Sequence, residues 1–166
     1  METSKGEFFR EVTLRICSSL DIEQALTRTF EYMAEVMPAD AMFLNYVDTD
    51  RRTMFPVAKV AQNGFVSFWE DVARETPLDD DFLRFFRDEV VGGVSVKLIN
   101  TPCEIPGPVR RCFPEIAAFS SMALNLSIRQ QPVGTLAVVA KGHNRYTKEQ
   151  AAMLELVKDP VALAMS

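Results

Sequence analysis

The sequence contains few of the residues from which metal centres and nucleophilic active sites are usually built. It has one histidine, His143, and three cysteines, Cys17, Cys103 and Cys112, none of them in a Cys-X-X-Cys pair. A structural zinc site needs four ligands at compact spacing, which this set does not supply. A Ser–His–acid triad needs a histidine beside its nucleophile, whereas His143 falls in a predicted surface loop. The residue types therefore argue against both kinds of chemistry.

Long apolar runs and clustered basic charge are also missing. No apolar segment approaches the roughly 20 residues that cross a bilayer, and the start of the chain is polar, unlike a secretory leader. The net charge is -5, and the only adjacent basic pairs are Arg51-Arg52 and Arg110-Arg111. Nucleic-acid binding needs clustered Lys and Arg. We therefore expect no nucleic-acid contact from this domain, no membrane association, and a cytoplasmic location with reduced cysteines.

The length and composition favour one domain. At 166 residues, with 48% hydrophobic and 25% charged residues, the chain is long enough to bury one sizeable core. We predict a single domain over residues 1–166. The apolar helical pattern continues to Ser166 without a terminating signal, so we also expect this domain to be a piece of a longer polypeptide.

The segment Ser121–Lys141 carries the clearest pattern in the chain. Two runs of period-two alternation flank a polar break at 129–132, which predicts an antiparallel hairpin. One face collects the large side chains, which helices should cover: Met122, Leu124, Leu126, Ile128, Leu136 and Val138. The other face collects small and weakly polar side chains: Ser121, Ala123, Asn125, Thr135 and Ala137. Small side chains leave room above a sheet, so we expect a ligand on this second face.

The other elements follow from periodicity and from capping or breaking residues. They are amphipathic helices over 7–20 and 22–37, a strand hairpin over 40–48 and 53–61, two short helices within 65–89 divided by Pro77, a strand within 90–99, a loop with one helical turn over 101–119, and a last helix. That last helix starts at a capping box of Thr147 and Gln150 and is expected to kink at Pro160. The helical stripes should pack in the core, with Cys17 facing it.

The stretch 65–89 is rich in aromatic residues and has no clean periodicity. Its rings could be plain core beneath a long connection or the lining of a small-molecule site, and the sequence leaves both open. As a site, the stretch would be a roof above a floor of strand residues, with Arg110 as a further polar candidate. The predicted ligand-binding residues are Tyr46, Phe65, Phe68, Trp69, Phe82, Ser121, Ala123, Asn125 and Ala137.

An acidic triplet, Asp79-Asp80-Asp81, lies within this stretch. Its carboxylates could hold a cation. The favoured interpretation is a solvated turn in which an aspartate caps the following helix.

Four segments of the chain resemble the GAF family. Residues 16–26, Ile-Cys-Ser-Ser-Leu-Asp-Ile-Glu-Gln-Ala-Leu, look like the family's two-helix opening, and residues 37–44 look like the start of its first strand. Residues 132–138 resemble its fifth-strand motif, in which Gly134 is the usual residue. Residues 146–150, followed by Met153-Leu154, resemble its last helix. The resemblance covers nearly the whole chain, with Asn125 where the family commonly has proline.

The resemblance implies an α+β fold, in which an antiparallel sheet of about six strands has the terminal helices on one face and a ligand pocket under short helices and loops on the other. GAF domains are regulatory modules that bind cyclic nucleotides, tetrapyrroles, haem, iron or small metabolites, and they commonly dimerise through their terminal helices. The opening phrase looks most like the N-terminal sensory domain of bacterial sigma-54-dependent, Fis-type transcription activators. The resemblance thus implies a noncovalent small-molecule ligand of unknown identity, a homodimer, and signalling without catalysis.

Other functions within the family stay open. Free methionine sulfoxide reductases of GAF type use several pocket cysteines, so Cys103 and Cys112 meeting across a loop would favour an enzyme. A dimerisation module of a signalling kinase or cyclase would have a collapsed pocket. A covalent bilin on Cys112 is not expected, because Phe113 stands where bilin-carrying members have histidine and Arg110 replaces the aspartate of the variant motif.

Overall fold

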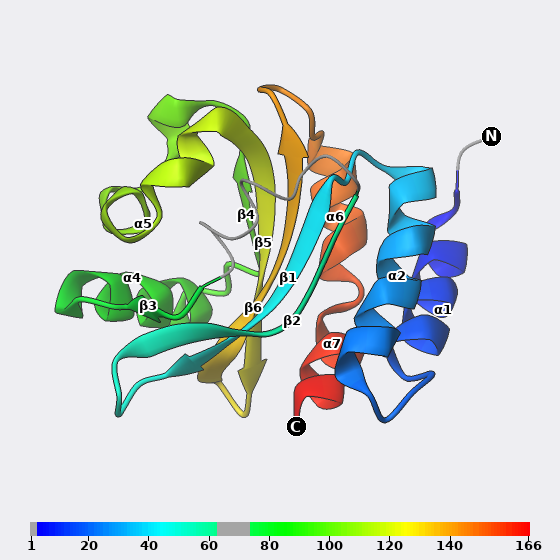
Figure 1. The fold of residues 1–166 in the computed structure, drawn as a ribbon, viewed down its shortest axis with the longest axis horizontal. Helices are drawn as coiled ribbons and strands as arrows, with labels where there is room; N and C mark the ends of the chain where they lie inside the picture. Colours follow the sequence, from blue (N-terminus) through cyan, green and yellow to red (C-terminus); the bar gives the residue numbers. More distant parts are fainter. Residues whose placement is uncertain (1–2, 63–73) are drawn as a thin grey trace.

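The centre of the molecule is a six-stranded antiparallel sheet between two helical layers (Figure 1). The computed structural model describes residues 3–62 and 74–166. Across the sheet the strands are ordered β3-β2-β1-β6-β5-β4, so β1 lies beside β6. Their bounds are β1 Ala41–Asp48, β2 Thr53–Ala61, β3 Thr76–Pro77, β4 Val96–Ile99, β5 Phe119–Ile128 and β6 Gln131–Lys141. The predicted antiparallel α+β fold is confirmed.

The two helical layers come from different parts of the chain. One layer contains α1 Lys5–Ile16, α2 Ile22–Val36, α6 Lys148–Glu155 and α7 Lys158–Met165. The other contains α4 Asp80–Val91, α5 Gly107–Cys112, and the 3-10 segments η1 Pro102–Glu104 and η2 Pro114–Ala118. Figure 1 shows the terminal helices to the right of the sheet, and α4 and α5 to its left. Within the described ranges, no helix combines the length and apolar character needed to cross a bilayer.

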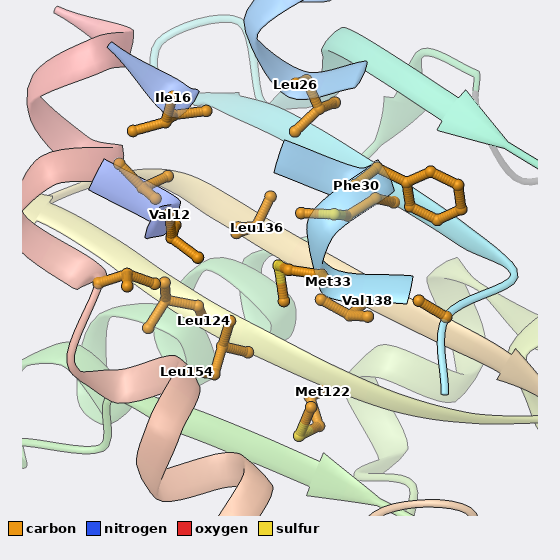
Figure 2. Close-up of a cluster of buried hydrophobic side chains, with 14 of the residues drawn as sticks. Val12, Ile16, Leu26, Phe30, Met33, Met122, Leu124, Leu136, Val138 and Leu154 are labelled. Carbon is orange, nitrogen blue, oxygen red and sulfur yellow. The ribbon is translucent and has the colours of Figure 1, made fainter. Parts of the chain in front are cut away.

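The main hydrophobic core lies between the sheet and the terminal helices (Figure 2). Leu124 and Leu136, on the neighbouring strands β5 and β6, and Leu154 of α6 have no exposed surface. Burial of such a side chain stabilises a fold by roughly 1.5–3 kcal/mol relative to leaving it exposed. Other members of this cluster are Val12, Ile16, Leu26, Phe30, Met33, Met42, Met122 and Val138. The large-residue face of the predicted hairpin is therefore the face that the helices cover.

Side-chain caps define where the helices begin. Asp21 Oδ1 accepts a hydrogen bond from the amide of Glu23 at 3.0 Å and so caps α2. The predicted capping box of α6 is present, because Gln150 N donates to Thr147 Oγ1 at 3.1 Å and Thr147 N donates to Gln150 Oε1 at 2.9 Å. The expected break in the last helix occurs just before Pro160, which lies in the first turn of α7, where a missing amide proton is tolerated.

Gly134 allows β6 to approach β1 closely. It pairs with Tyr46 across the two strands, and a Cβ atom built on it would lie 1.9 Å from the carbonyl oxygen of Asn45. Any side chain would therefore push the two central strands apart. This contact gives a physical reason for glycine in the 132–138 motif.

Tyr146 joins two of the segments that carried the resemblance. Its hydroxyl donates to the carbonyl oxygen of Pro38 at 2.7 Å, just before β1. Its own amide donates to Asn100 Oδ1 at 3.0 Å, and its carbonyl oxygen accepts from Asn100 Nδ2 at 2.8 Å. Burial raises the pKa of the Tyr146 hydroxyl, so it stays a donor. The start of α6 is thereby held against the start of β1.

Several predicted boundaries were wrong. The strand expected within 90–99 covers only Val96–Ile99, because α4 continues to Val91 and Gly92 caps it. Pro77 lies in β3 rather than between two helices, and residues 63–73 lie outside the described ranges. Residues 101–119 form three short helical segments, each with a proline in its first turn, instead of one turn.

Ile128 and Cys17 are among the side chains that were predicted to be in the core and are exposed. Ile128 is 39% exposed because the register between β5 and β6 shifts between Leu126 and Ser127, which ends the helix-covered row. Cys17 is exposed because it caps the C-terminal end of α1 instead of lying within its apolar stripe.

Candidate ligand-binding site

A cavity of about 140 Å³ lies on the sheet face opposite the terminal helices. Its floor comes from the strands β1, β2, β4, β5 and β6, and its roof comes from α4, α5 and η2. The strand pairing sets the side chains of the floor in transverse rows, because residues paired across antiparallel strands point to the same face. The position of this cavity is the one that the small-residue face of the hairpin predicts.

The floor of the cavity has small side chains at its centre and polar side chains at one end. The central row contains Ala123 and Ala137, which are paired across β5 and β6. The polar row contains Asn125, Thr135 and Asn45 on the consecutive strands β5, β6 and β1. Asn45 Nδ2 donates to Thr135 Oγ1 at 3.3 Å, and Asn125 Nδ2 donates to the carbonyl oxygen of Val94 at 3.0 Å (in the α4–β4 connection). Uncharged donors and acceptors are thus held beside the cavity.

The roof is largely aromatic. Phe82, Phe85 and Phe86 of α4 line the cavity together with Phe113, which follows α5. The ring centroids of Phe82 and Phe86 are 6.5 Å apart, and those of Phe82 and Phe113 are 6.0 Å apart in an edge-to-face arrangement. Apolar contact with these rings would supply most of the binding energy of a ligand.

Two ion pairs border the cavity. Glu89 of α4 lies 3.8 Å from Lys97 of β4, and Arg74 lies 3.0 Å from Glu115 of η2. The Glu89 side chain is 10% exposed. Burial raises the pKa of Glu89, and the attraction of Lys97 and a hydrogen bond from Asn125 offset only part of that effect.

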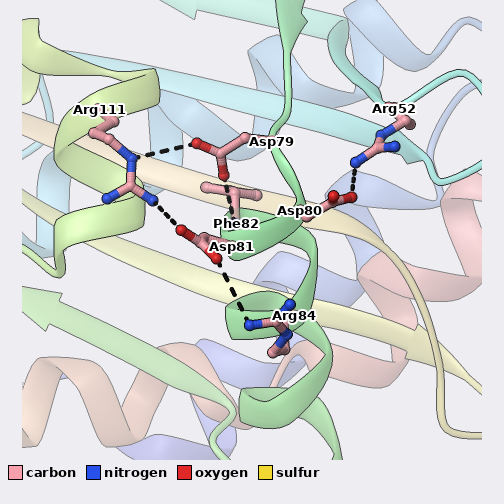
Figure 3. Close-up of polar contacts among 7 residues, drawn as sticks. All are labelled: Arg52, Asp79, Asp80, Asp81, Phe82, Arg84 and Arg111. Carbon is pink, nitrogen blue, oxygen red and sulfur yellow. Dashed lines mark hydrogen bonds and ion pairs between the residues drawn. The ribbon is translucent and has the colours of Figure 1, made fainter.

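The acidic triplet caps α4 and connects it to α5 through ion pairs (Figure 3). Asp79 accepts from the amide of Phe82 at 2.8 Å and caps α4. Arg111 of α5 lies 3.3 Å from Asp79 and 3.1 Å from Asp81. The hydrogen bond from Phe82 and the Arg111 guanidinium lower the pKa of Asp79. The remaining triplet contacts are ion pairs of Asp80 with Arg52 and of Asp81 with Arg84.

These contacts give the triplet a structural role. The helix cap agrees with the favoured interpretation from the sequence. In residues 3–62 and 74–166, no group of three or more His, Cys, Asp and Glu side chains has an arrangement that could hold a metal ion. Arg111 instead joins α5 to the first turn of α4.

The structure brings five of the predicted ligand-binding residues together. Those that line the cavity are Phe82, Ser121, Ala123, Asn125 and Ala137. Phe65, Phe68 and Trp69 lie outside the described residues. The binding role of this set stays a prediction.

Tyr46 and Arg110 do not line the cavity. Tyr46 lies on the other face of β1, 38% exposed, with its ring 5.2 Å from that of Phe55. Its position alternates with Asn45, so the strand geometry sends Asn45 toward the cavity and Tyr46 away from it. The Arg110 guanidinium instead donates to the carbonyl oxygen of Pro102 in η1.

Several polar residues at the cavity were not in the predicted set. Asn45 was detectable, because period-two alternation in β1 places it opposite Tyr46. Thr135 was on the predicted small-residue face but not among the predicted binding residues. Arg74 comes from an irregular segment, Glu89 from α4 and Lys97 from the short strand β4, and their approach depends on tertiary packing that no sequence pattern indicates.

Similarity to known proteins comes from solved structures, since no family model and no curated protein matches the chain. The phycocyanobilin-bound GAF domain of a cyanobacterial phytochrome is 13% identical, with a TM-score of 0.69, and the match covers 99% of this chain and 95% of that one. The GAF domain of an Acinetobacter phosphoenolpyruvate-protein phosphotransferase is 14% identical, with a TM-score of 0.66 and coverage of 99% and 94%.

The fold is GAF-like. A third GAF-like match, free methionine-R-sulfoxide reductase from Neisseria meningitidis in complex with its substrate, is 11% identical, with a TM-score of 0.67 and coverage of 99% and 93%. At these identities the matches establish the fold alone, and they include a reductase as well as GAF domains of a phytochrome and of a phosphotransferase. Function must therefore be argued from the residues of this chain.

Proposed function

We propose that this GAF-like domain is a sensory module that binds a small molecule noncovalently in the cavity between the sheet and α4. The observation that supports the proposal is the contrast within single strands. Leu136 on one face of β6 is fully buried in the core, whereas Ala137, the next residue, lies beneath an aromatic roof with space above it. A face meant only for packing would be filled by larger side chains.

Ligand binding would act through the strands that both layers share. The floor strands carry the cavity on one face and the terminal helices on the other, and α7 packs directly on β5. A ligand that binds better to one arrangement of the α4–α5 roof shifts the population of molecules toward that arrangement, together with the sheet and helices attached to it. The free energy that the ligand can pass to an effector equals the difference between its binding free energies for the two arrangements of the roof.

The effector we propose is that of a sigma-54-dependent transcription activator. The support is the resemblance of residues 16–26 to the opening of those sensory domains. We propose that the domain forms a homodimer through its terminal helices, which carry exposed large apolar side chains: Phe9 and Leu14 on α1 and Leu163 on α7. Light scattering of the purified domain should give a dimer, and a monomer at micromolar concentration would remove this route of transmission.

The proposed mechanism needs no catalysis. None of the described residues that line the cavity is a cysteine. Cys17 and Cys103 are exposed, and burial raises the pKa of the Cys112 thiol, which lowers its thiolate fraction. We expect no reduction of free methionine sulfoxide. Turnover that is lost in Cys103→Ser or Cys112→Ser would favour the reductase instead.

Xenon binding tests whether the cavity admits a guest, because xenon enters apolar cavities without needing polar contacts. We expect ¹²⁹Xe NMR to detect binding to the wild-type domain. Ala137→Leu adds three carbon atoms at the centre of the floor and should abolish this binding. Ala118→Leu makes the same change at an exposed position at the end of η2 and should leave it intact. Exclusion of xenon from the wild type would contradict the proposal.

A further inference from the structure

The charged side chains that line the cavity are already paired with opposite charges. Among the described residues these side chains are Glu89, Lys97 and Arg74. Glu89 and Lys97 neutralise each other at 3.8 Å, and Arg74 is neutralised by Glu115 at 3.0 Å. The part of the chain that the structure describes therefore presents no uncompensated charge to this cavity.

This pairing works against charged ligands. An anion that approached Lys97 would compete with Glu89, and a cation that approached Glu89 would compete with Lys97. An anion on Lys97 would leave the carboxylate of Glu89, whose side chain is only 10% exposed, without its partner, and such a charge is costly. A cation at Glu89 would be repelled by Lys97. The ligand itself would also lose its hydration. An uncharged ligand avoids both penalties.

The volume limits the ligand to about one ring. A cavity of about 140 Å³ is close to the size of an apolar cavity of about 150 Å³ that admits benzene. The rings of Phe82, Phe85 and Phe86 form one wall, and Ala123 and Ala137 form the opposite wall. This arrangement favours a flat apolar body.

The polar row supplies an uncharged anchor at one end. Thr135 Oγ1 accepts from Asn45 Nδ2 at 3.3 Å, and a threonine hydroxyl that accepts one hydrogen bond still has its own proton to donate. The Asn45 amide oxygen adds an acceptor beside it. A ligand hydroxyl or amide has the complementary donor and acceptor groups.

From the paired charges, the volume and this anchor, we propose that the ligand is an uncharged single-ring molecule with one hydroxyl or amide group directed toward Thr135 and Asn45. The assignment rests on the proposed function, since it names the class of molecule that the same cavity takes. It sets this cavity apart from sites for ionic ligands or for ligands with several rings.

Calorimetric titrations at pH 7 with four ring compounds of similar size test the assignment. Phenol and benzamide are uncharged, benzoate is an anion, and benzylammonium is a cation. We expect phenol or benzamide to bind at least tenfold more tightly than both ions. Benzoate or benzylammonium binding as tightly as the uncharged compounds would overturn the assignment while leaving the proposed function intact.

Absence of binding has a separate meaning in each assay. If none of the four compounds binds while xenon still enters the wild-type domain, the single-ring class is wrong. If xenon is also excluded, the proposed function itself fails.

Two variants test the chemical reasons behind the assignment. Glu89→Gln leaves Lys97 without its carboxylate, so the affinity for benzoate relative to that for phenol should rise at least tenfold over wild type. Thr135→Val keeps the side-chain shape but removes the hydroxyl, so phenol should bind at least tenfold more weakly while the xenon signal remains. Thr27→Val makes the same change on α2, in the helical layer on the other face of the sheet, and as the matched control it should keep wild-type phenol affinity. An unchanged affinity for benzoate relative to phenol in Glu89→Gln, or unchanged phenol affinity in Thr135→Val, would overturn the corresponding part.

Discussion

The two faces of the central strands are built from alternate residues of the same segments, yet they differ in side-chain size and in what covers them. Toward the terminal helices, Met122, Leu124 and Leu136 are completely buried in one continuous core. Toward α4, the intervening positions include Ala123 and Ala137 beneath a cavity. The comparison teaches that the packed face stabilises the sheet, so the side chains of the other face can be small and leave space for a ligand.

The largest effect should come from a truncation on the packed face. Leu136→Ala removes buried contacts and leaves a hole in the core, so we expect the free energy of unfolding to fall by about 2–5 kcal/mol. Urea denaturation followed by circular dichroism measures this loss. Ala137→Leu, the adjacent residue on the opposite face, is the control, and its cost should stay below about 1.5 kcal/mol because space lies above it. Equal losses in the two variants would contradict the difference between the faces.

A smaller loss is expected where the two central strands meet. The Cβ atom of Gly134→Ala would collide with the backbone of Asn45, and forcing β1 and β6 apart should cost about 1–3 kcal/mol. Chemical denaturation gives the value. Gly142→Ala, at a positive φ but with open space around it, separates backbone strain from collision and should cost less. If Gly134→Ala were as stable as wild type, β1 and β6 could move apart to admit the Cβ atom without a cost in free energy, which would contradict this prediction.

Tyr146→Phe tests the contact that joins the last helix to the first strand. The variant keeps the buried ring but leaves the carbonyl oxygen of Pro38 without its donor, which should cost about 1 kcal/mol. Thermal unfolding should show a lower Tm. Tyr46→Phe, whose ring is partly exposed beside Phe55, is the matched control and should change Tm little. A Tm equal to that of wild type in Tyr146→Phe would contradict a stabilising role for this bond.

The smallest effect, and a pH-dependent one, is expected at Glu89 on the cavity side. Burial raises the pKa of this carboxyl in the folded state, so the folded domain binds its proton more tightly than the unfolded chain does. The cost of its charge is therefore present above the raised pKa and disappears as the pH falls through that value toward the ordinary one. Glu89→Gln should have a higher Tm than wild type at pH 7.

The difference should shrink as the pH is lowered. Melting curves of both proteins between pH 7 and pH 4 measure it. A Glu89→Gln variant that is less stable than wild type at pH 7 would mean that the attraction of Lys97 outweighs the burial of the carboxyl.

Period-two alternation predicts the packed face and the floor because each strand has unlike surroundings on its two sides. Leu124 and Leu136 lie in the core and Ala123 and Ala137 at the cavity, as their positions in the pattern indicate. The prediction for Tyr46 was wrong because it followed the polar hydroxyl and not the alternation. Tyr46 belongs to the same face of β1 as Met42, which lies in the core.

The roof was beyond prediction for a different reason. Its residues lie in short helices and connections without a sustained period, and their partners come from distant parts of the chain. Arg111 meets Asp79 and Asp81, and Glu89 meets Lys97, through tertiary packing that no local spacing encodes. Helix 107–112 is too short for its apolar positions to define a face.

The placement of β1 beside β6 also governs how the molecule assembles. β1 forms a local hairpin with β2, and β6 forms another with β5, but the pairing that unites the two hairpins joins residues 41–46 to residues 134–139. Contacts between segments so distant in sequence require a large loop to close, which slows folding. During synthesis, the middle of the sheet stays incomplete until β6 has left the ribosome, and until then the edge of β1 has no neighbour of its own to protect it from aggregation.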